Sequence, residues 1–66
     1  MKLTDLWSRL EQTFGPEYAA SVANDQVLMQ LGDRTINQAL AEHVEVHDVW
    51  RAVVAAYPDR VPARLR

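Results

Sequence analysis

Apolar residues repeat with the period of a helix near both ends of the chain. In each repeat they fall at i, i+3, i+4 and i+7 and continue one turn further, which is typical of a helix that packs one face against a core. The residues concerned are Leu3, Leu6, Trp7, Leu10 and Phe14 in the first segment, and Val46, Val49, Trp50, Val53, Val54 and Tyr57 in the second. Gly15 follows the first segment and Pro58 the second, and both residue types commonly end helices. The pattern predicts helices over 4–14 and 46–57.

The segment over 16–31, which ends at a second glycine stop, Gly32, has apolar residues on two opposite sides of a continuous helix. Tyr18, Val22 and Met29 form one stripe, and Ala20, Ala23, Val27 and Leu31 form the other. We favour a single helix, with or without a kink, that is sandwiched between its neighbours or buries one face against a partner chain. The alternative is a break near Asn24 and Asp25, either of which could cap a second short helix.

A capping box begins the third predicted helix. Thr35 stands at the cap position and Gln38 follows three residues later, so each side chain can bond the backbone amide of the other. This helix is expected to run to about Glu42 and to bury three residues, Ile36, Ala39 and Leu40. Short connections between the helices predict an all-α fold class, a compact four-helix orthogonal bundle, with five helices if the segment over 16–31 breaks.

The last part of the chain, 58–66, contains two prolines and has no helical period. We predict a helical domain over 1–57 and a short extended tail over 58–66 that is docked loosely or mobile. Removal of such a tail is expected to cost no more than about 1 kcal/mol, the scale of exposed ion pairs.

Composition is that of a globular domain, with 48% apolar and 24% charged residues. The chain has no cysteine, which removes disulfides, thiolate metal sites and cysteine nucleophiles from consideration and fits a reducing compartment. No apolar run approaches the length that spans a bilayer, and the first ten residues are too polar for a signal peptide. We therefore expect a cytoplasmic protein with no membrane association.

Charge is unevenly distributed. The whole chain carries −2, but residues 1–50 carry −5 and residues 51–66 carry +3. The acidic charge of residues 1–50 argues against general nucleic-acid binding, because proteins that bind nucleic acids present a basic face. The candidate interaction residues, for an anion or an acidic protein, are the four arginines of the second part, Arg51, Arg60, Arg64 and Arg66. The alternative is that they form a solvated tail.

Residues for catalysis or metal binding are sparse. Ser8 and Ser21 lie on predicted helices with no partner motif, so they are interpreted as exposed helix positions. His43 and His47 have a spacing that could hold a metal on one helix, but the predicted turn falls between them. We predict no catalytic residue, no metal site and no cofactor.

The helices over 35–42 and 46–57 resemble a helix-turn-helix in outline. In that arrangement the second helix would enter the major groove with its N-terminal end. Glu45 and Asp48 stand there and would repel phosphate, so ordinary packing is favoured. Trp7 and Trp50 lie within apolar stripes, and we interpret both as core residues rather than as anchors for a partner.

The chain also resembles a known family. The resemblance is carried by the segments 1–7, 14–19 and 31–36, followed by Ala39-Leu40 and 49–53. In this order they are similar to a family of small actinobacterial proteins known as domain of unknown function 3046. That family has no assigned activity, so the resemblance implies no site residue. Genes of the family often lie near that of the recombinase regulator RecX, which implies at most a shared process.

This chain departs from the family pattern in the connection between the third and fourth predicted helices. Where the family tends to have glycine after its third helix and Asp-Pro at the start of its fourth, this chain has His43 and Glu45-Val46. These residues are weaker capping signals for the end of the third helix and the start of the fourth, but the expected fold is unchanged.

These observations favour a small, non-catalytic protein-interaction module that binds an unidentified protein partner. A homodimer is compatible with the two apolar faces of the segment over 16–31. The alternative is a nucleic-acid-associated accessory protein, in a recombination or repair context, that uses the C-terminal arginines.

Overall fold

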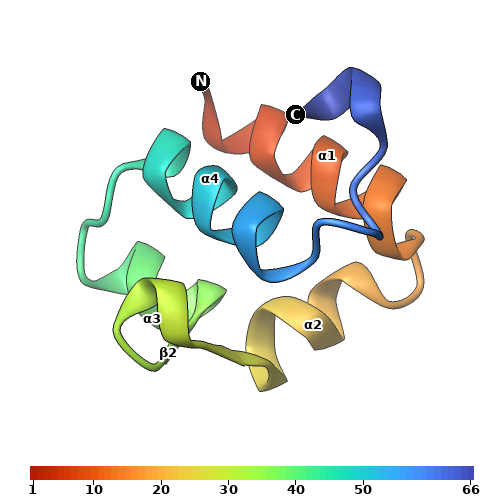
Figure 1. Ribbon diagram of the computed structural model, residues 1–66. Coiled ribbons are helices and arrows are strands. Elements are labelled where there is room, and N and C mark those ends of the chain that lie inside the picture. Colours follow the sequence, from red (N-terminus) through yellow and green to blue (C-terminus); the bar gives the residue numbers. More distant parts are fainter.

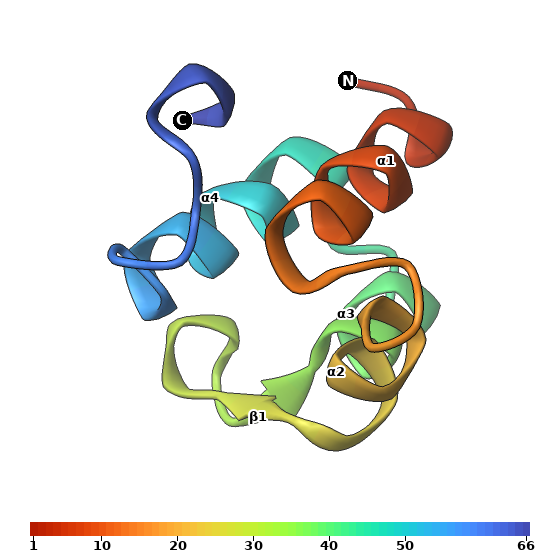
Figure 2. The same ribbon diagram turned by 90° about the vertical axis from the view of Figure 1, so that its right-hand side faces the viewer.

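The computed structural model describes all 66 residues and arranges them in two layers (Figures 1 and 2). The elements are, in chain order, α1 (Leu3–Phe14), α2 (Ala19–Asp25), β1 (Val27–Leu28), the 3-10 turn η1 (Met29–Leu31), β2 (Arg34–Thr35), α3 (Ile36–Ala41), α4 (Val46–Ala56) and the 3-10 turn η2 (Ala63–Leu65). In both views α1 and α4 form one layer, and α2, α3 and the strands form the other. The two termini lie on the same side, beyond the layer of α1 and α4.

A small hairpin makes the fold α+β, so the predicted all-α class is wrong. β1 and β2 are antiparallel, with Val27 opposite Thr35 and Leu28 opposite Arg34. The backbone leaves the helical conformation at Gln26, where φ is −87° and ψ is 117°. Each strand has only two residues, which is too short to show the alternation that identifies a strand in a sequence.

The single helix that we predicted over 16–31 is also wrong, and the alternative break near Asn24 and Asp25 is the correct one. α2 has seven residues and ends at Asp25. A strand and a 3-10 turn follow, rather than the second α-helix of the alternative, and the Asn24 side chain donates to the Asp25 carboxylate at 3.3 Å. Val27 and Met29 are 58% and 78% exposed, so the two predicted apolar stripes are not both buried.

The other predicted helices are confirmed to within one residue at each end. α3 begins with the predicted capping box, in which the amide of Gln38 donates to Thr35 Oγ1 at 3.1 Å and the amide of Thr35 donates to Gln38 Oε1 at 2.9 Å. Gly15 follows α1 with a φ of 92°, a conformation that favours glycine, although its ψ of 148° is extended and not left-handed helical. Pro58 follows α4 after Tyr57, as expected.

Gly32 and Arg34 together close the hairpin loop. Gly32 has the left-handed backbone, with φ 70° and ψ 41°, and a Cβ there would lie 2.6 Å from Nη1 of Arg34. In the space that glycine leaves, Arg34 Nη1 donates to the carbonyl of Leu31 at 3.1 Å. Arg34 Nε also pairs with Glu42 Oε2 at 2.9 Å, which ties the hairpin to the end of α3.

The end of α3 has the hydrogen bonds of a Schellman motif. The amide of Val44 donates to the carbonyl of Ala39 at 3.0 Å, and the amide of His43 donates to that of Leu40 at 3.1 Å. His43 itself has a φ of 66°. Histidine therefore holds a left-handed position that glycine usually occupies in this motif.

All four α-helices, the hairpin and the C-terminal segment contribute to one hydrophobic core. Its buried members are Leu6, Leu10, Phe14, Ala19, Ala23, Leu28, Ile36, Ala39, Val49, Trp50, Val53 and Val61. Trp50 is 2% exposed, which confirms it as a core residue, and Trp7 packs half-buried against the same cluster. None of the helices is both long and apolar enough to span a membrane.

The segment over 58–66 packs on this core and is not the loosely docked, extended tail that we predicted. Val61 is 3% exposed, and its amide donates to the carbonyl of Tyr57 at 3.1 Å. The indole Nε1–H of Trp50 donates to the carbonyl of Leu65 at 3.0 Å. The segment turns back along the layer of α1 and α4 (Figure 1), and two prolines, which favour turns, lie within it.

Candidate functional site

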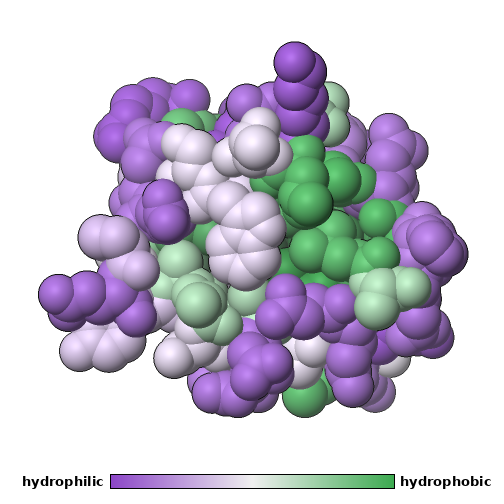
Figure 3. Space-filling view, turned by 180° about the vertical axis from the view of Figure 1, so that it is seen from behind, coloured by the Kyte–Doolittle hydropathy of each residue, from purple (hydrophilic) through white to green (hydrophobic).

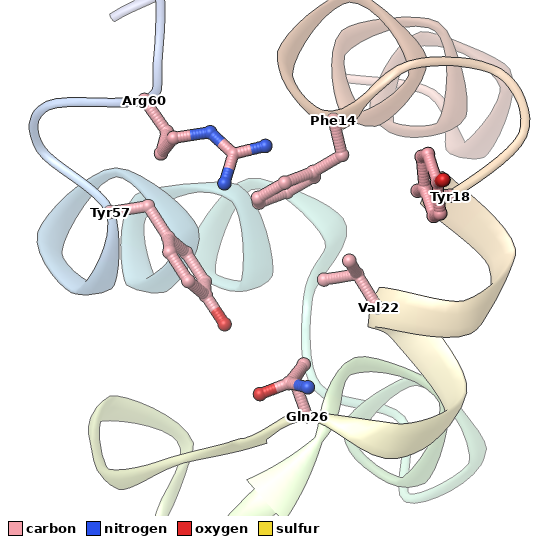
Figure 4. A pocket seen from close by; sticks show the side chains of 6 residues that line it. All are labelled: Phe14, Tyr18, Val22, Gln26, Tyr57 and Arg60. Atoms are coloured by element: carbon pink, nitrogen blue, oxygen red, sulfur yellow. The ribbon is translucent and has the colours of Figure 1, made fainter.

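An open pocket of about 420 Å³, here called the aromatic pocket, lies between the two layers. It is lined by Phe14, Tyr18, Val22, Gln26, Tyr57 and Arg60. These residues come from the end of α1, the turn after it, α2, the start of the hairpin, the end of α4 and the C-terminal segment. In Figure 4 the Val22 and Gln26 side chains point into the opening from α2 and the residue that follows it, and Tyr57 faces them from the other side.

Aromatic contacts build the upper wall of this pocket. The rings of Phe14 and Tyr57 meet edge to face, with centroids 5.0 Å apart and an interplanar angle of 82°. The guanidinium carbon of Arg60 lies 5.2 Å from the centroid of the Phe14 ring, a cation–π contact. Tyr18, on the opposite side, is 65% exposed. The wall is therefore fixed by packing, while one aromatic side chain remains open to solvent.

A second opening of about 370 Å³, here called the arginine hollow, lies between α1, α4 and the C-terminus. It is lined by Arg9, His47, Trp50, Arg51, Val54, Ala55 and Arg66. No carboxylate residue lines it. The single ion pair of the chain, Arg34 with Glu42, lies elsewhere. The arginine hollow thus gathers three arginine side chains in a chain whose net charge is −2.

The side chains of the arginine hollow are partly held in place. The guanidinium carbon of Arg9 lies 5.6 Å from the centroid of the Trp50 ring, and Arg9 Nη1 donates a long hydrogen bond of 3.5 Å to the carbonyl of Leu65. The same carbonyl accepts the indole N–H of Trp50. Arg66 Nη2 donates to the carbonyl of Pro58. These contacts fasten the C-terminal segment and the arginine hollow together.

The four arginines predicted as interaction residues do not form one cluster. Arg51 and Arg66 share the arginine hollow, whereas Arg60 lines the aromatic pocket. Arg64 lies outside both openings and donates to Gln12 Oε1 at 3.2 Å. Sequence analysis missed Arg9, which the packing of α1 against α4 brings to Arg51. No sequence signal links these two positions, because their proximity depends on how the helices pack.

Sequence analysis also missed the aromatic pocket. We assigned Tyr18 and Tyr57 to apolar stripes, and a stripe does not distinguish a core position from the rim of an opening. The unusual signal was Tyr18, an aromatic residue directly before a short run of small residues. It stands at the N-cap of α2 and is 65% exposed.

The candidate catalytic and metal residues lie apart from both openings, with the exception of His47. Ser8 Oγ accepts a hydrogen bond from the Gln12 side chain at 3.2 Å on an exposed face of α1, and Ser21 is exposed on α2. His43 ends α3, and His47 lies in the first turn of α4. No group of three His, Cys, Asp or Glu side chains is arranged to hold a metal ion.

A hydrophobic area covers part of the face on which α1, α2 and α3 lie (Figures 2 and 3). Apolar residues of α1 and of the end of α3 that reach solvent include Leu3, which is 49% exposed, and the half-buried Trp7, Leu40 and Val44. Polar side chains frame this area in Figure 3. None of these residues lines the aromatic pocket or the arginine hollow.

A comparison with protein families gives one match. The model of a family described as "Protein of unknown function (DUF3046)" matches residues 1–64. No curated protein and no solved structure matches the chain.

Proposed function

The chain belongs to the DUF3046 family, whose function is unknown, and we propose that it is a small protein-interaction module and not an enzyme. The aromatic pocket is the observation that supports this proposal best. Its lining combines two tyrosines, a phenylalanine and an arginine. Aromatic residues and arginine are the types enriched at the centres of protein interfaces, where a few residues supply most of the binding energy.

The shape of the aromatic pocket suits one apolar or aromatic side chain of a partner. Its volume of about 420 Å³ lies within the range of sites that enclose small organic groups. Phe14 and Val22 supply apolar walls, while the polar groups of Gln26 and Arg60 stand at the opening (Figure 4). A partner could therefore bury a hydrophobic group and hydrogen-bond its backbone at the same place. The aromatic walls are already packed against each other, which lowers the entropy lost on binding.

The second candidate is a nucleic-acid-associated accessory protein in a recombination or repair context. It requires the arginines to form one basic surface along a phosphate backbone. Arg60 and Arg64 are separated from the pair of Arg51 and Arg66, and each has its own contact. The protein-interaction module is favoured for that reason. We propose the cytoplasm as its compartment, because the chain has no cysteine and a globular composition.

Affinity capture from the native cell with three forms of the protein tests the proposal. The forms are the unchanged chain, Tyr18→Ala and Met29→Ala. Tyr18 and Met29 are 65% and 78% exposed, so both variants should keep the fold, but only Tyr18 lines the aromatic pocket. Loss of an interface tyrosine at a binding centre should lower partner recovery about tenfold or more. Recovery with Met29→Ala should match that of the unchanged chain.

Circular dichroism on the three forms supplies the folding control. Equal recovery of every captured protein by all three forms would contradict the aromatic pocket as the binding site. Sedimentation velocity adds a separate outcome. If the chain sediments as a dimer that Tyr18→Ala dissociates, the partner is a second copy of this chain.

A further inference from the structure

We propose that the arginine hollow binds a carboxylate of an acidic segment in the protein partner. This inference rests on the proposed function and adds to it the chemistry of a second contact. Arg9, Arg51 and Arg66 come together from α1, α4 and the C-terminus, with His47 beside them and no carboxylate residue in the lining. Three guanidinium groups that take part in no side-chain ion pair are complementary to an anionic group.

The donors of the arginine hollow are partly preorganised. Arg9 is held over the Trp50 ring and donates to the carbonyl of Leu65. Arg51 is exposed on α4 and takes part in no ion pair. A guanidinium has five N–H donors in a planar fork, so the contacts within the chain leave most of them free. The fork matches the two oxygens of a carboxylate, and preorganisation reduces the entropy lost when it binds.

The rest of the lining favours a peptide over a nucleic acid. Val54 and Ala55 stand beside the arginines, and an acidic peptide segment can place an apolar side chain on them next to its carboxylate. A phosphate backbone offers no such apolar group. It would also carry its charges past Glu45 and Asp48, the carboxylates at the start of α4, which repel phosphate. An acidic peptide brings fewer charges near these two carboxylates than a phosphate backbone, which carries one per nucleotide.

The indole N–H signals of the two tryptophans in a ¹H–¹⁵N spectrum test this inference. Trp50 lines the arginine hollow and Trp7 does not, so Trp7 is an internal control. The probe is a terminally blocked Leu-Glu-Glu-Leu peptide, and Leu-Gln-Gln-Leu is its neutral counterpart. We expect the acidic peptide to shift the Trp50 signal alone, and the shift to decrease as NaCl is added. The neutral peptide should leave both signals in place.

Two charge-matched variants locate the binding. Arg51→Gln removes a cation that lines the arginine hollow, whereas Arg64→Gln removes one outside it, and both change the net charge equally. Arg51→Gln should weaken binding of the acidic peptide about tenfold, the scale of a charge-assisted hydrogen bond, and Arg64→Gln by less than about twofold. Equal weakening by both variants, or no shift of Trp50, would overturn the inference.

A single-stranded oligothymidylate is titrated in parallel. If it shifts Trp50 at lower concentration than the acidic peptide, and Arg51→Gln abolishes that shift, the arginine hollow binds nucleic acid and the inference is wrong. The proposed function fails independently. If Tyr18→Ala leaves partner capture unchanged while the acidic peptide still binds, the aromatic pocket is discarded and the arginine hollow stands. If Tyr18→Ala abolishes capture while the peptide does not bind, only the present inference is lost.

Discussion

The hairpin over 26–35 and the C-terminal segment over 58–66 are both short and irregular, yet they relate to the core in different ways. The C-terminal segment has two prolines within 58–66 and no period, but it buries Val61 to 3% exposure. The hairpin has a pattern rich in apolar residues, but it leaves Val27 and Met29 more than half exposed. Both segments place one residue in the core, Leu28 and Val61, so regularity and apolar content do not decide which side chains are buried. What decides it is where the turns direct each side chain.

The two segments also use hydrogen bonds differently. In the C-terminal segment the carbonyl of Leu65 accepts the buried indole N–H of Trp50, so a backbone group satisfies a core side chain. In the hairpin the bonds join the two strands, and Arg34 bonds both its own loop and Glu42, which directly follows α3. Changes at the buried positions of the C-terminal segment should therefore affect global stability, and changes at the exposed positions of the hairpin should have local consequences.

The largest effect is expected for Trp50→Ala. The substitution leaves a cavity in the core and removes both the ring beneath Arg9 and the donor to Leu65. We expect a loss of about 3–5 kcal/mol in the free energy of unfolding, comparable with the total stability of a chain this small. Urea denaturation followed by circular dichroism measures it. Trp50→Phe keeps most of the volume and should retain a cooperative transition, whereas unchanged unfolding of Trp50→Ala would contradict core packing by Trp50.

Truncation after Tyr57 should have the next largest effect. From the sequence we expected a cost of no more than about 1 kcal/mol, the scale of exposed ion pairs. The structure revises that expectation to about 2–4 kcal/mol, because burial of a valine and part of a leucine is lost together with the acceptor of Trp50. The same denaturation experiment measures the difference. A truncated chain as stable as the complete one would show that the C-terminal segment is peripheral after all.

The same substitution in both segments tests the comparison directly. Val→Thr keeps the shape of the side chain and adds a hydroxyl. Val61→Thr buries that hydroxyl in the core and should cost about 1–3 kcal/mol. Val27→Thr places it in solvent on a β-strand, where threonine is well suited, and should change stability by less than about 0.5 kcal/mol. Equal losses in the two variants would contradict the different burial of the two segments.

The period of apolar residues was enough to predict α1 and α4, and the Thr35–Gln38 pair was enough to predict the start of α3. The hairpin could not be predicted in this way. Its strands have two residues each, and Val27 and Leu28 fit a helical stripe as well as a strand. The pairing with residues 34–35 depends on the turn at Gly32, which we interpreted only as a helix stop.

The candidate sites were predictable only in part. The charge distribution identified Arg51 and Arg66, both of which line the arginine hollow. It could not identify Arg9, because the contact between α1 and α4 joins residues that are far apart in the sequence. The docked position of Val61 was missed because two prolines were interpreted as marks of an extended segment, although proline also directs tight turns.

The smallest effect is expected at His43, where α3 repeats a feature of the hairpin loop with a different residue. The hairpin loop has glycine in the left-handed conformation at Gly32, with φ 70°, and α3 has histidine there, with φ 66°. A non-glycine residue in this conformation costs about 1–2 kcal/mol, while glycine costs about 0.4–1 kcal/mol through the greater freedom of the unfolded chain. His43→Gly should therefore stabilise the protein by roughly 0.5–1 kcal/mol, measured as a higher urea midpoint with an unchanged slope. Gly32→Ala is the reciprocal control and should destabilise, because its Cβ would also meet Arg34. A lower midpoint for His43→Gly would indicate that the imidazole makes a stabilising contact that outweighs the backbone strain.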